Sequence, residues 1–399
     1  MRDIYMERNS LEKRNFISIA IVMPDMELGG AEKSFLTFIE MFKGKSVSVS
    51  LLLFHRTGAL LSHVPDWVKV IELPGAGRLD RLRKKGSNFL ARCGLTRFYD
   101  IFKHFYHLFG SGANFGKKYK NIDYDVVIAY KDGTATWFAR NIIARVKIAF
   151  FHTDFVRAGY NPIKEKKVYD SFDQIYCVSS AAKKSFVQAL PALAEKTSVF
   201  YTIIDQKKLH SSVKFGPSFL DDFNGIRILT VGRLSHEKGL DKAIKALSLL
   251  KVNGYYVRWY IVGEGCEKSN LSKLIAANHL QDDFIFLGEV ENPYRLMADC
   301  DIYVQPSNYE GYCLAIAEAR ALYCPIVACD FSGAKEQIVN RETGIITGMS
   351  AENLYEGISQ LIRDNDLREK IKNNLKKPIS QDAKQFDELY DFITRKLGL

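Results

Sequence analysis

The feature that most constrains the fold is a repeated alternation of short apolar runs with stretches of helical spacing. The first apolar run covers residues 16–23, and residues 31–42 then place Phe35, Phe38 and Phe42 on one helical stripe. Because the runs are apolar throughout, they are typical of parallel strands that are covered on both faces. The alternation therefore predicts an α/β fold built on doubly wound parallel sheets. The strands expected in the first half of the chain are residues 16–23, 47–54, 67–73, 125–129, 147–151, 174–178 and 198–204.

The alternation lapses once and then restarts, and this lapse divides the chain. Residues 206–225 are polar and contain glycine and proline, which is typical of a linker between domains. A length of 399 residues also exceeds what one core usually supports. We therefore expect two Rossmann-like domains, residues 1–205 and 226–378, that face a central cleft where ligands bind. A C-terminal helix within residues 379–399 is expected to pack back on the first domain. The second half is expected to contain strands at residues 226–231, 255–262, 284–287, 301–305 and 326–329 and helices at residues 240–251, 268–278, 314–322 and 382–397.

Composition favours a globular protein of the cytoplasm. The chain is 47% hydrophobic and 26% charged, which is typical of a folded protein. Its seven scattered cysteines include no Cys-x-x-Cys pair, so that free thiols in a reducing compartment are expected. No apolar run approaches the roughly 18 residues of a membrane-spanning helix, and no signal segment is expected either.

Glu310 and Glu318 flank the start of an expected helix that follows the strand at residues 301–305. We expect Gly311 to open a tight turn there, so that the next backbone amides lie at the positive end of the helix and can bind an anion. Glu318 lies among small apolar residues and needs hydrogen-bond donors, which the hydroxyls of a sugar or ribose could supply. A capped helix with a buried glutamate paired to an arginine explains these residues equally well. The amides concerned belong to Gly311, Tyr312, Cys313 and Leu314.

Three further strand ends in the second domain carry glycine or charged residues. Arg233 and Lys238 lie in a loop that we expect to be exposed, and two cations beside a helix start suit a diphosphate. A solvated basic loop is the simpler alternative. Glycine turns follow the next two strands, at residues 263–265 and at Gly288. Because the carboxyl ends of parallel strands share one edge of the sheet, we expect these three loops and the Glu310 turn to lie side by side at that edge. A requirement for tight turns does not readily explain four such loops on one edge.

The first domain offers two weaker signals. Gly29 and Gly30 lie between a strand and a helix, where the backbone could approach a ligand closely, although a plain tight turn explains them as well. His152 ends a strand of the same domain. A histidine satisfied by its neighbours is the simpler explanation of that residue.

Taken together, these motifs resemble family 4 of the glycosyltransferases, a large family of retaining nucleotide-sugar enzymes with the two-domain GT-B fold. The combination is specific, although no single motif is. Ala315 stands where many members carry proline, and residues 78–120 match no family motif. The matching segments are residues 29–33, 152–154, 178–180, 231–240, 262–265, 286–288 and 310–318, and the last of these holds the family's two glutamates with seven residues between them.

The resemblance implies retaining transfer of a hexosyl unit from a nucleotide-diphosphate sugar, with the donor on the second domain and the acceptor on the first. By the same resemblance, Arg233 and Lys238 bind the diphosphate and stabilise the leaving nucleotide. Glu310 binds hydroxyls of the donor sugar, Glu318 binds the ribose, and His152 lies near the reacting sugar. The implied donor-binding set is completed by Gly29, Gly30, Gly232, Gly263, Gly265, Gly311, Tyr312, Cys313 and Leu314.

We expect no essential metal and no cofactor beyond the nucleotide sugar. Arg233 and Lys238 can stabilise the charge that develops on the leaving phosphate without a metal. The one Asp-x-Asp pattern, residues 364–366, lies between expected helices and is better explained as a turn and helix cap. No residue is an obvious covalent nucleophile, so a front-face route is expected.

Most of the net charge lies in one segment. Residues 78–120 hold eleven Lys or Arg and two Asp, a net +9 of the chain's +10. Within the segment, Phe98, Phe102 and Phe105 follow helical spacing, and a basic amphipathic helix with aromatic residues is typical of a membrane surface. Packing of the same stripe on the first domain's sheet is an equal alternative. The segment suggests docking on the anionic inner face of a membrane, with a lipid-linked or cell-surface glycan as acceptor.

Two alternative functions remain. A nucleotide-sugar epimerase has the same fold but isomerises the donor instead of transferring the sugar. A basic nucleic-acid-binding protein is supported only by residues 78–120 and leaves the two glutamates unexplained, so nucleic acid is not an expected partner.

Overall fold

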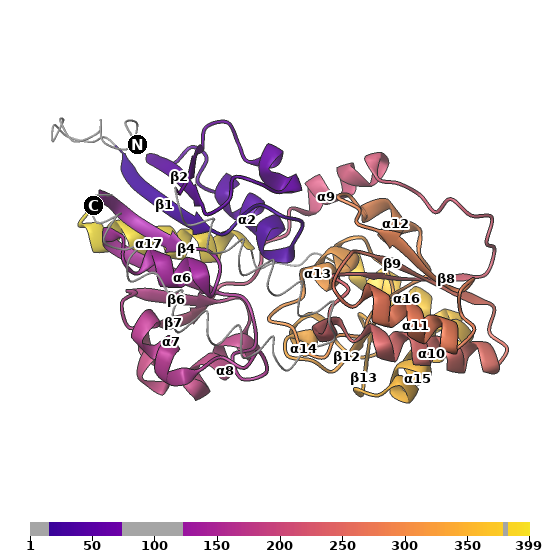
Figure 1. Ribbon diagram of the computed structural model, residues 1–399. Helices are drawn as coiled ribbons and strands as arrows, with labels where there is room; N and C mark the ends of the chain where they lie inside the picture. Colours follow the sequence, from indigo (N-terminus) through magenta and orange to yellow (C-terminus); the bar gives the residue numbers. More distant parts are fainter. Residues whose placement is uncertain (1–15, 74–122, 378–381) are drawn as a thin grey trace. The chain divides into compact units, whose positions relative to one another are not determined.

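The computed structural model describes residues 16–73, 123–377 and 382–399 and forms two compact units (Figure 1). Each unit is an α/β fold around a parallel sheet, as the alternation of apolar runs and helices predicts. Of the described residues, the first unit contains 16–73, 123–178, 183–201 and 382–399, and the second contains 179–182 and 202–377.

The first unit has the strand order β3-β2-β1-β4-β5-β6-β7 within its described residues. The central strands are buried along most of their length, which agrees with a sheet covered on both faces. The order reverses between β1 and β4, so the loops after these strands form the topological switch point of this unit. The strands are β1 (Ile17–Met23), β2 (Val47–Leu53), β3 (Lys69–Glu72), β4 (Asp123–Ala129), β5 (Ile143–Phe151), β6 (Gln174–Cys177) and β7 (Thr197–Val199). The helices along this part of the chain are α2 (Gly30–Glu40), η2 (Ala59–His63), α6 (Thr134–Ala139), α7 (Pro162–Tyr169), α8 (Ser180–Ala189) and η3 (Pro191–Lys196), and α17 (Asp382–Leu397) joins them from the C-terminal end.

An aromatic core joins α2 to the C-terminal helix α17 in the first unit. Phe38 lies 5.3 Å from Phe150 of β5, measured between ring centroids, and Phe386 of α17 lies 4.9 Å from Phe42. The side chain of Gln385 also exchanges two hydrogen bonds of 2.9 Å with the backbone of Tyr201. Helix α17 therefore packs within the first unit, and its bounds are those expected from the sequence.

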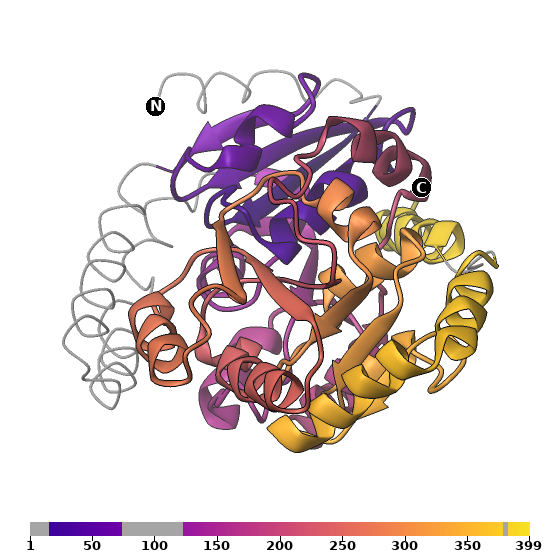
Figure 2. The same cartoon turned by 90° about the vertical axis from the view of Figure 1, so that its right-hand side faces the viewer.

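The second unit has the strand order β10-β9-β8-β11-β12-β13. The order reverses between β8 and β11, so the ends of these two strands form the switch point of this unit. Helices α10 and α15 pack side by side in the second unit (Figure 2). The strands are β8 (Ile226–Val231), β9 (Val257–Val262), β10 (Phe284–Gly288), β11 (Ile302–Gln305), β12 (Ile326–Cys329) and β13 (Ile345–Thr347). The helices are α9 (Gln206–Ser212), η4 (Val213–Phe215), η5 (His236–Lys238), α10 (Leu240–Val252), α11 (Lys268–Ala277), α12 (Tyr294–Asp299), α13 (Leu314–Ala321), α14 (Ala334–Gln337), α15 (Ala351–Arg363) and α16 (Asn365–Leu375).

The chain passes from the first unit to the second just after Tyr201, upstream of the segment expected as a linker. Residues 206–225 belong to the second unit and begin with helix α9. Farther along, the carboxylate of Asp221 binds Arg258 at 2.9 Å and the hydroxyl of Tyr260 at 2.7 Å. The polarity of this segment therefore reflects a helix and a set of ion pairs on the second unit.

The Asp-x-Asp pattern at residues 364–366 caps a helix, as predicted. The carboxylate of Asp364 accepts a hydrogen bond from the amide of Leu367 at 2.8 Å, at the start of α16. Its charge therefore serves the helix terminus.

Within the ranges that the structure describes, no helix has both the length and the apolar composition needed to cross a membrane. The basic amphipathic helix expected within residues 78–120 lies outside the described residues.

Candidate active site

The candidate site lies at the carboxyl edge of the second unit's sheet, around the β8–β11 switch point. The loops after β10, β9, β8 and β11 leave four neighbouring parallel strands. The shared edge expected from the sequence is therefore confirmed. Open α/β sheets bind ligands in the crevice outside such an edge.

The loops after β8 and β11 are joined by Asn308. Its backbone amide donates to the carbonyl of Glu237 at 2.7 Å, and its Nδ2 donates to the carbonyl of His236 at 2.7 Å. Gly239, at the end of the β8 loop, has a φ of 62°, and a Cβ there would collide with the carbonyl of Pro306. Only glycine fits where these two loops meet.

An ion pair between Lys238 and Glu310 is the centre of the site. Nζ of Lys238 lies 2.6 Å from Oε1 of Glu310, and each side chain exposes 14% of its surface. Burial lowers the pKa of Lys238, but the Glu310 carboxylate outweighs burial and holds that pKa above its usual value. The expectation that Lys238 lies in an exposed loop is therefore wrong. Its stem runs inward over Gly232, where a Cβ would come within 3.3 Å of Cδ.

Arg233 points toward solvent instead. Its side chain exposes 72% of its surface, and its guanidinium lies 3.3 Å from a carboxylate oxygen of Glu237. Burial would raise the pKa of Glu237, but the nearby Ser235 hydroxyl and the charge of Arg233 hold that pKa below its usual value. The structure thus brings Lys238 to Glu310 and leaves Arg233 as an exposed cation in the same loop as Lys238.

Behind Glu310 lies a line of buried polar side chains that were not predicted from the sequence as part of the site. The hydroxyl of Ser307 donates to Oε1 of Glu310 at 2.7 Å, and Nε2 of Gln305 donates to Ser307 at 2.8 Å. The hydroxyl of Tyr303 donates to the amide oxygen of Gln305 at 2.7 Å. The signal in the sequence is the spacing of two residues, which places Tyr303 and Gln305 on one face of β11 and continues to Ser307 just after the strand.

The turn before α13 has its left-handed residue at Cys313 and not at Gly311. Cys313 has a φ of 72° and is the N-cap of α13. Nε2 of Gln337 donates to the carbonyls of Tyr312 and Cys313, so the amides of Cys313 and Leu314, across the same peptide planes, face the opposite way. Among the described residues, none accepts a hydrogen bond from either amide. Both amides can therefore bind an anion.

Glu318 is buried on α13, with 4% of its surface exposed. The hydroxyl of Tyr294, at the start of α12, donates to Oε1 of Glu318 at 2.9 Å. Burial and the Glu318 carboxylate both raise the pKa of Tyr294, so its phenol keeps the proton that it donates. Tyr294 thus supplies a donor that a buried carboxylate needs.

The two glycines after β9 allow close packing of loops. A Cβ at Gly263 would collide with the carbonyl of Gly232, and a Cβ at Gly265 would collide with the carbonyl of Leu234. The β9 loop therefore lies directly on the β8 loop that carries Lys238. Contact of these glycines with a donor stays a prediction.

The residues predicted in the first unit lie around its own β1–β4 switch point. Nε2 of His152 lies 2.7 Å from the carbonyl of Tyr130, so this nitrogen carries the proton of the hydrogen bond. Burial lowers the pKa of His152, and its imidazole is therefore neutral at pH 7. Glu32 forms an ion pair with Lys131, and a Cβ at Gly29 would collide with the Glu32 carboxylate. Gly30 is the first residue of α2.

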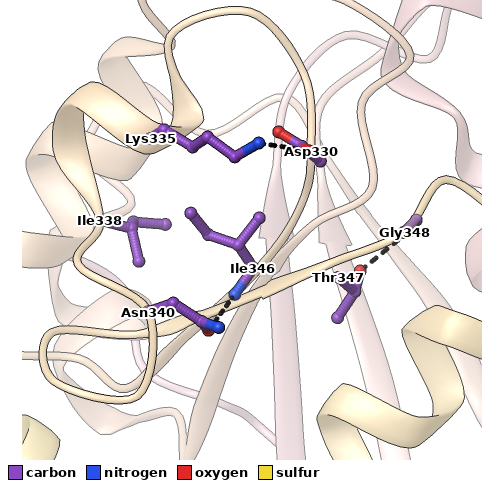
Figure 3. Close-up of a pocket in the computed structure, with 7 residues that line it drawn as sticks. All are labelled: Asp330, Lys335, Ile338, Asn340, Ile346, Thr347 and Gly348. Atoms are coloured by element: carbon purple, nitrogen blue, oxygen red, sulfur yellow. Dashed lines mark hydrogen bonds and ion pairs between the residues drawn. The ribbon is translucent and has the colours of Figure 1, made fainter.

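A pocket of about 400 Å³ opens at the ends of β12 and β13 (Figure 3). Across it, Nζ of Lys335 lies 2.7 Å from a carboxylate oxygen of Asp330. The side-chain oxygen of Asn340 accepts a hydrogen bond from the amide of Ile346 at 3.0 Å. The residues that line this pocket include none of those predicted to bind the donor.

Comparison with known protein families gives a match in the second unit. Residues 221–378 match the family model described as "Glycosyl transferases group 1". This range contains Arg233, Lys238, Glu310 and Glu318.

Curated relatives match parts of the chain. A diphospho-undecaprenol 4-alpha-N-acetylgalactosaminyltransferase of Campylobacter jejuni is 29% identical over 241 residues, which are 59% of this chain and 63% of that protein. A diphospho-undecaprenol alpha-1,3-N-acetylgalactosaminyltransferase of the same organism is 32% identical over 162 residues, which are 40% of this chain and 41% of that protein. The chain thus spans less than two thirds of the length of these relatives.

Solved structures match nearly the whole chain. Anabaena HepE in complex with UDP and glucose superposes with a TM-score of 0.71 at 21% identity, over 95% of this chain and 100% of that chain. Sucrose-phosphate synthase from Thermosynechococcus elongatus gives a TM-score of 0.66 at 16% identity, over 96% of this chain and 97% of that chain. These likenesses show that the chain has the two-domain α/β fold called GT-B, as the resemblance implied.

Proposed function

We propose that this protein is a retaining glycosyltransferase that moves a hexosyl unit from a nucleotide-diphosphate sugar to an acceptor. The observation that carries the proposal is the Lys238–Glu310 pair together with the acceptor-free amides of Cys313 and Leu314. Lys238 is paired with Glu310, which lies three residues before Cys313 in the turn that leads into α13. A cation with two amides suits a phosphate, and a carboxylate suits sugar hydroxyls.

The chemical step separates a nucleoside diphosphate from the sugar, and negative charge develops on the leaving phosphate. Lys238 carries its proton, because its pKa is raised, and the amides at the start of α13 are already oriented. Donors fixed in advance in this way are a major source of transition-state stabilisation. Arg233 is exposed and can add a second cation when the donor binds.

We further propose that transfer needs no essential metal. Lys238 and Arg233 supply positive charge to the leaving group from the chain itself. Turnover that persists in EDTA would support this part of the proposal. Loss of turnover in EDTA, with recovery when Mg²⁺ is restored, would contradict it.

The two glutamates have different parts in the proposal. Glu310 lies beside Lys238 and would accept hydrogen bonds from hydroxyls of the donor sugar. Glu318 lies within α13 beside Tyr294 and would accept from the ribose. Retention of configuration rests on the family resemblance, and a front-face route is proposed because no residue stands out as a covalent nucleophile.

We propose an acceptor that is lipid-linked or part of a cell-surface glycan, bound by the first unit near His152. The support is twofold. Two relatives are named for diphospho-undecaprenol substrates, and residues 78–120 carry most of the net positive charge. The proposed location is accordingly the cytoplasm, with docking on the inner face of the membrane.

A screen of nucleotide sugars tests the function. We expect one nucleotide sugar to be hydrolysed slowly alone and to raise the melting temperature, because a ligand that binds only the folded state stabilises it. With a diphospho-undecaprenol acceptor, the sugar should appear on the lipid. Isomerised donor without transfer would favour an epimerase. Binding of nucleic acid with steep salt dependence, and no response to any nucleotide sugar, would overturn the proposal.

A further inference from the structure

Glu310 receives two hydrogen bonds on the same oxygen. Nζ of Lys238 lies 2.6 Å from Oε1, and Oγ of Ser307 lies 2.7 Å from that same atom. Within the described part of the chain, no residue donates a hydrogen bond to Oε2. The carboxylate is thus held through one oxygen, and the other can accept from a ligand hydroxyl.

The side chains behind Glu310 have one direction of hydrogen bonding when Glu310 is ionised. A carboxylate only accepts, so the single hydroxyl hydrogen of Ser307 must point to Glu310. Ser307 must then accept from Gln305, whose Nε2 lies 2.8 Å away. The amide oxygen of Gln305 consequently faces Tyr303, whose hydroxyl donates to it at 2.7 Å.

Burial fixes this direction. Tyr303, Gln305 and Ser307 have no exposed surface, so water cannot replace a lost partner. A buried amide or hydroxyl without a partner destabilises the structure, and each group therefore holds its neighbour in one orientation. Strand β11 carries Tyr303 and Gln305, which attaches the line to the rigid sheet.

We propose that Ser307 and Gln305 are positioning residues for Glu310. Gln305 directs the hydroxyl hydrogen of Ser307 to Oε1, and this bond orients Oε2 toward the sugar of the donor. The inference rests on the proposed function, because it takes Glu310 as the group that binds the donor sugar. Both residues act through Glu310, so their loss should lower turnover without weakening the binding of the nucleotide.

The direct test is Ser307→Ala, which leaves Oε1 of Glu310 to Lys238 alone. With the nucleotide sugar that the wild-type protein turns over, kcat should fall about ten- to a hundredfold, as expected when a charged group loses a hydrogen bond. The affinity for the corresponding nucleoside diphosphate should not change. Ser307→Thr keeps the hydroxyl and should restore most of kcat. An unchanged kcat in Ser307→Ala would overturn the inference.

A double variant tests whether Gln305 acts through Ser307. Gln305→Leu should lower kcat less than Ser307→Ala, because the hydroxyl of Ser307 still donates to Glu310 but is no longer held in place by the Gln305 amide. The double variant should be no slower than Ser307→Ala alone, since coupled residues are not additive. Losses that simply multiply would show an independent effect of Gln305 and would overturn its positioning role.

The matched control is Ser359→Ala in α15. Ser359 is also fully buried, and its hydroxyl donates to the carbonyl of Glu356 at 3.0 Å. This variant should leave kcat unchanged. If the wild-type protein turns over no nucleotide sugar, the proposed function fails. A crystal structure of Ser307→Ala then decides the positioning by itself, because an unmoved Glu310 carboxylate would overturn it.

Discussion

Lys238 and Glu310 meet across the β8–β11 switch point, each from a loop that follows a different strand. Nζ of the lysine lies 2.6 Å from Oε1 of the glutamate, and both side chains are largely buried. A buried pair of this kind is destabilised strongly when one partner alone is removed. A substitution of Lys238 should therefore change both stability and turnover, whereas a substitution of Arg233 should change turnover alone.

Lys238→Ala should lower both turnover and stability. Turnover should fall on the order of 10²–10³-fold, because a fixed cation at the leaving phosphate is lost. The free energy of unfolding should fall by about 3 kcal/mol, because Glu310 is left without its counter-ion. Urea unfolding measures the second effect, and adding Glu310→Gln should recover part of it. A variant as stable as the wild-type protein would contradict the ion pair.

Arg233→Ala should affect turnover alone. The side chain is exposed, so the free energy of unfolding should change by no more than about 0.5 kcal/mol. Turnover should still fall on the order of 10²–10³-fold if the guanidinium meets the phosphate of the bound donor. Steady-state kinetics and urea unfolding on the same preparation separate the two effects. Near-normal turnover would remove Arg233 from the proposed site.

The two glutamates should differ in which kinetic constant they change. Glu310→Gln should lower kcat more than donor affinity, because Glu310 is proposed to meet the reacting sugar. Glu318→Gln should mainly weaken donor binding, because Glu318 is proposed to meet the ribose. Tyr294→Phe keeps the Glu318 carboxylate and removes one of its donors, so it is the control for local packing. Equal effects of both glutamine variants on kcat and on affinity would contradict the assignment.

Glu165 predicts a pH dependence of stability in the first unit. Burial raises its pKa from 4.5 to about 7, and the nearby Trp137 indole only partly opposes this. The folded protein therefore keeps a proton that the unfolded chain releases. The stability from this group is fully present below the unfolded value of 4.5 and is lost as the pH rises through about 7.

Glu165→Gln should remove that dependence. Relative to the wild-type protein, its free energy of unfolding should rise between about pH 5 and about pH 8, by on the order of 2–3 kcal/mol. Urea unfolding of both proteins across this range gives the difference directly. Curves that stay parallel with pH would show that Glu165 does not hold its proton.

Replacing Arg81, Arg83, Lys84 and Lys85 by Ser should abolish binding to anionic vesicles. Each cation near an anionic leaflet contributes about 1 kcal/mol of binding free energy. Removing four cations should therefore cost more than the whole binding free energy of a weakly bound surface protein. Donor hydrolysis should persist, because Lys238 and Glu310, which are proposed to bind the donor, are unchanged. Vesicle co-sedimentation at low salt measures the binding. The charge-matched control replaces the exposed residues Arg363, Lys370, Lys376 and Lys377. Wild-type protein that ignores anionic vesicles would rule out membrane docking by this segment.

Much of the fold is predictable because it depends on local periodicity. Strand β12 and helix α17 have the bounds expected from the sequence, since apolar runs and helical stripes report burial directly. The segment at residues 206–225 is different. Its polar residues form helix α9 and ion pairs, and composition alone cannot distinguish these uses from a solvated linker.

The candidate site is predictable only in outline. The shared edge of the loops follows from strand parallelism, and Lys238 and Glu310 follow from motif spacing. The inward path of the Lys238 stem, the left-handed Cys313 and the hydrogen bonds of Gln305 depend on which loops touch in three dimensions. A single sequence does not say which loops touch, so these three features could not be predicted from it.

The missing side chain of Gly232 matters to the site as much as the functional groups do, because the Lys238 stem occupies the space that a side chain would take. The Lys238 stem passes so close that a methyl group at position 232 would meet Cδ and Cε at 3.3 Å, which is tighter than most contacts of a Cβ. Such a change adds no charge, removes no hydrogen-bonding group and would pass as conservative in any ranking by chemical type. Variants of this position should therefore be judged by volume, because even alanine there would crowd the stem that carries the Lys238 ammonium group.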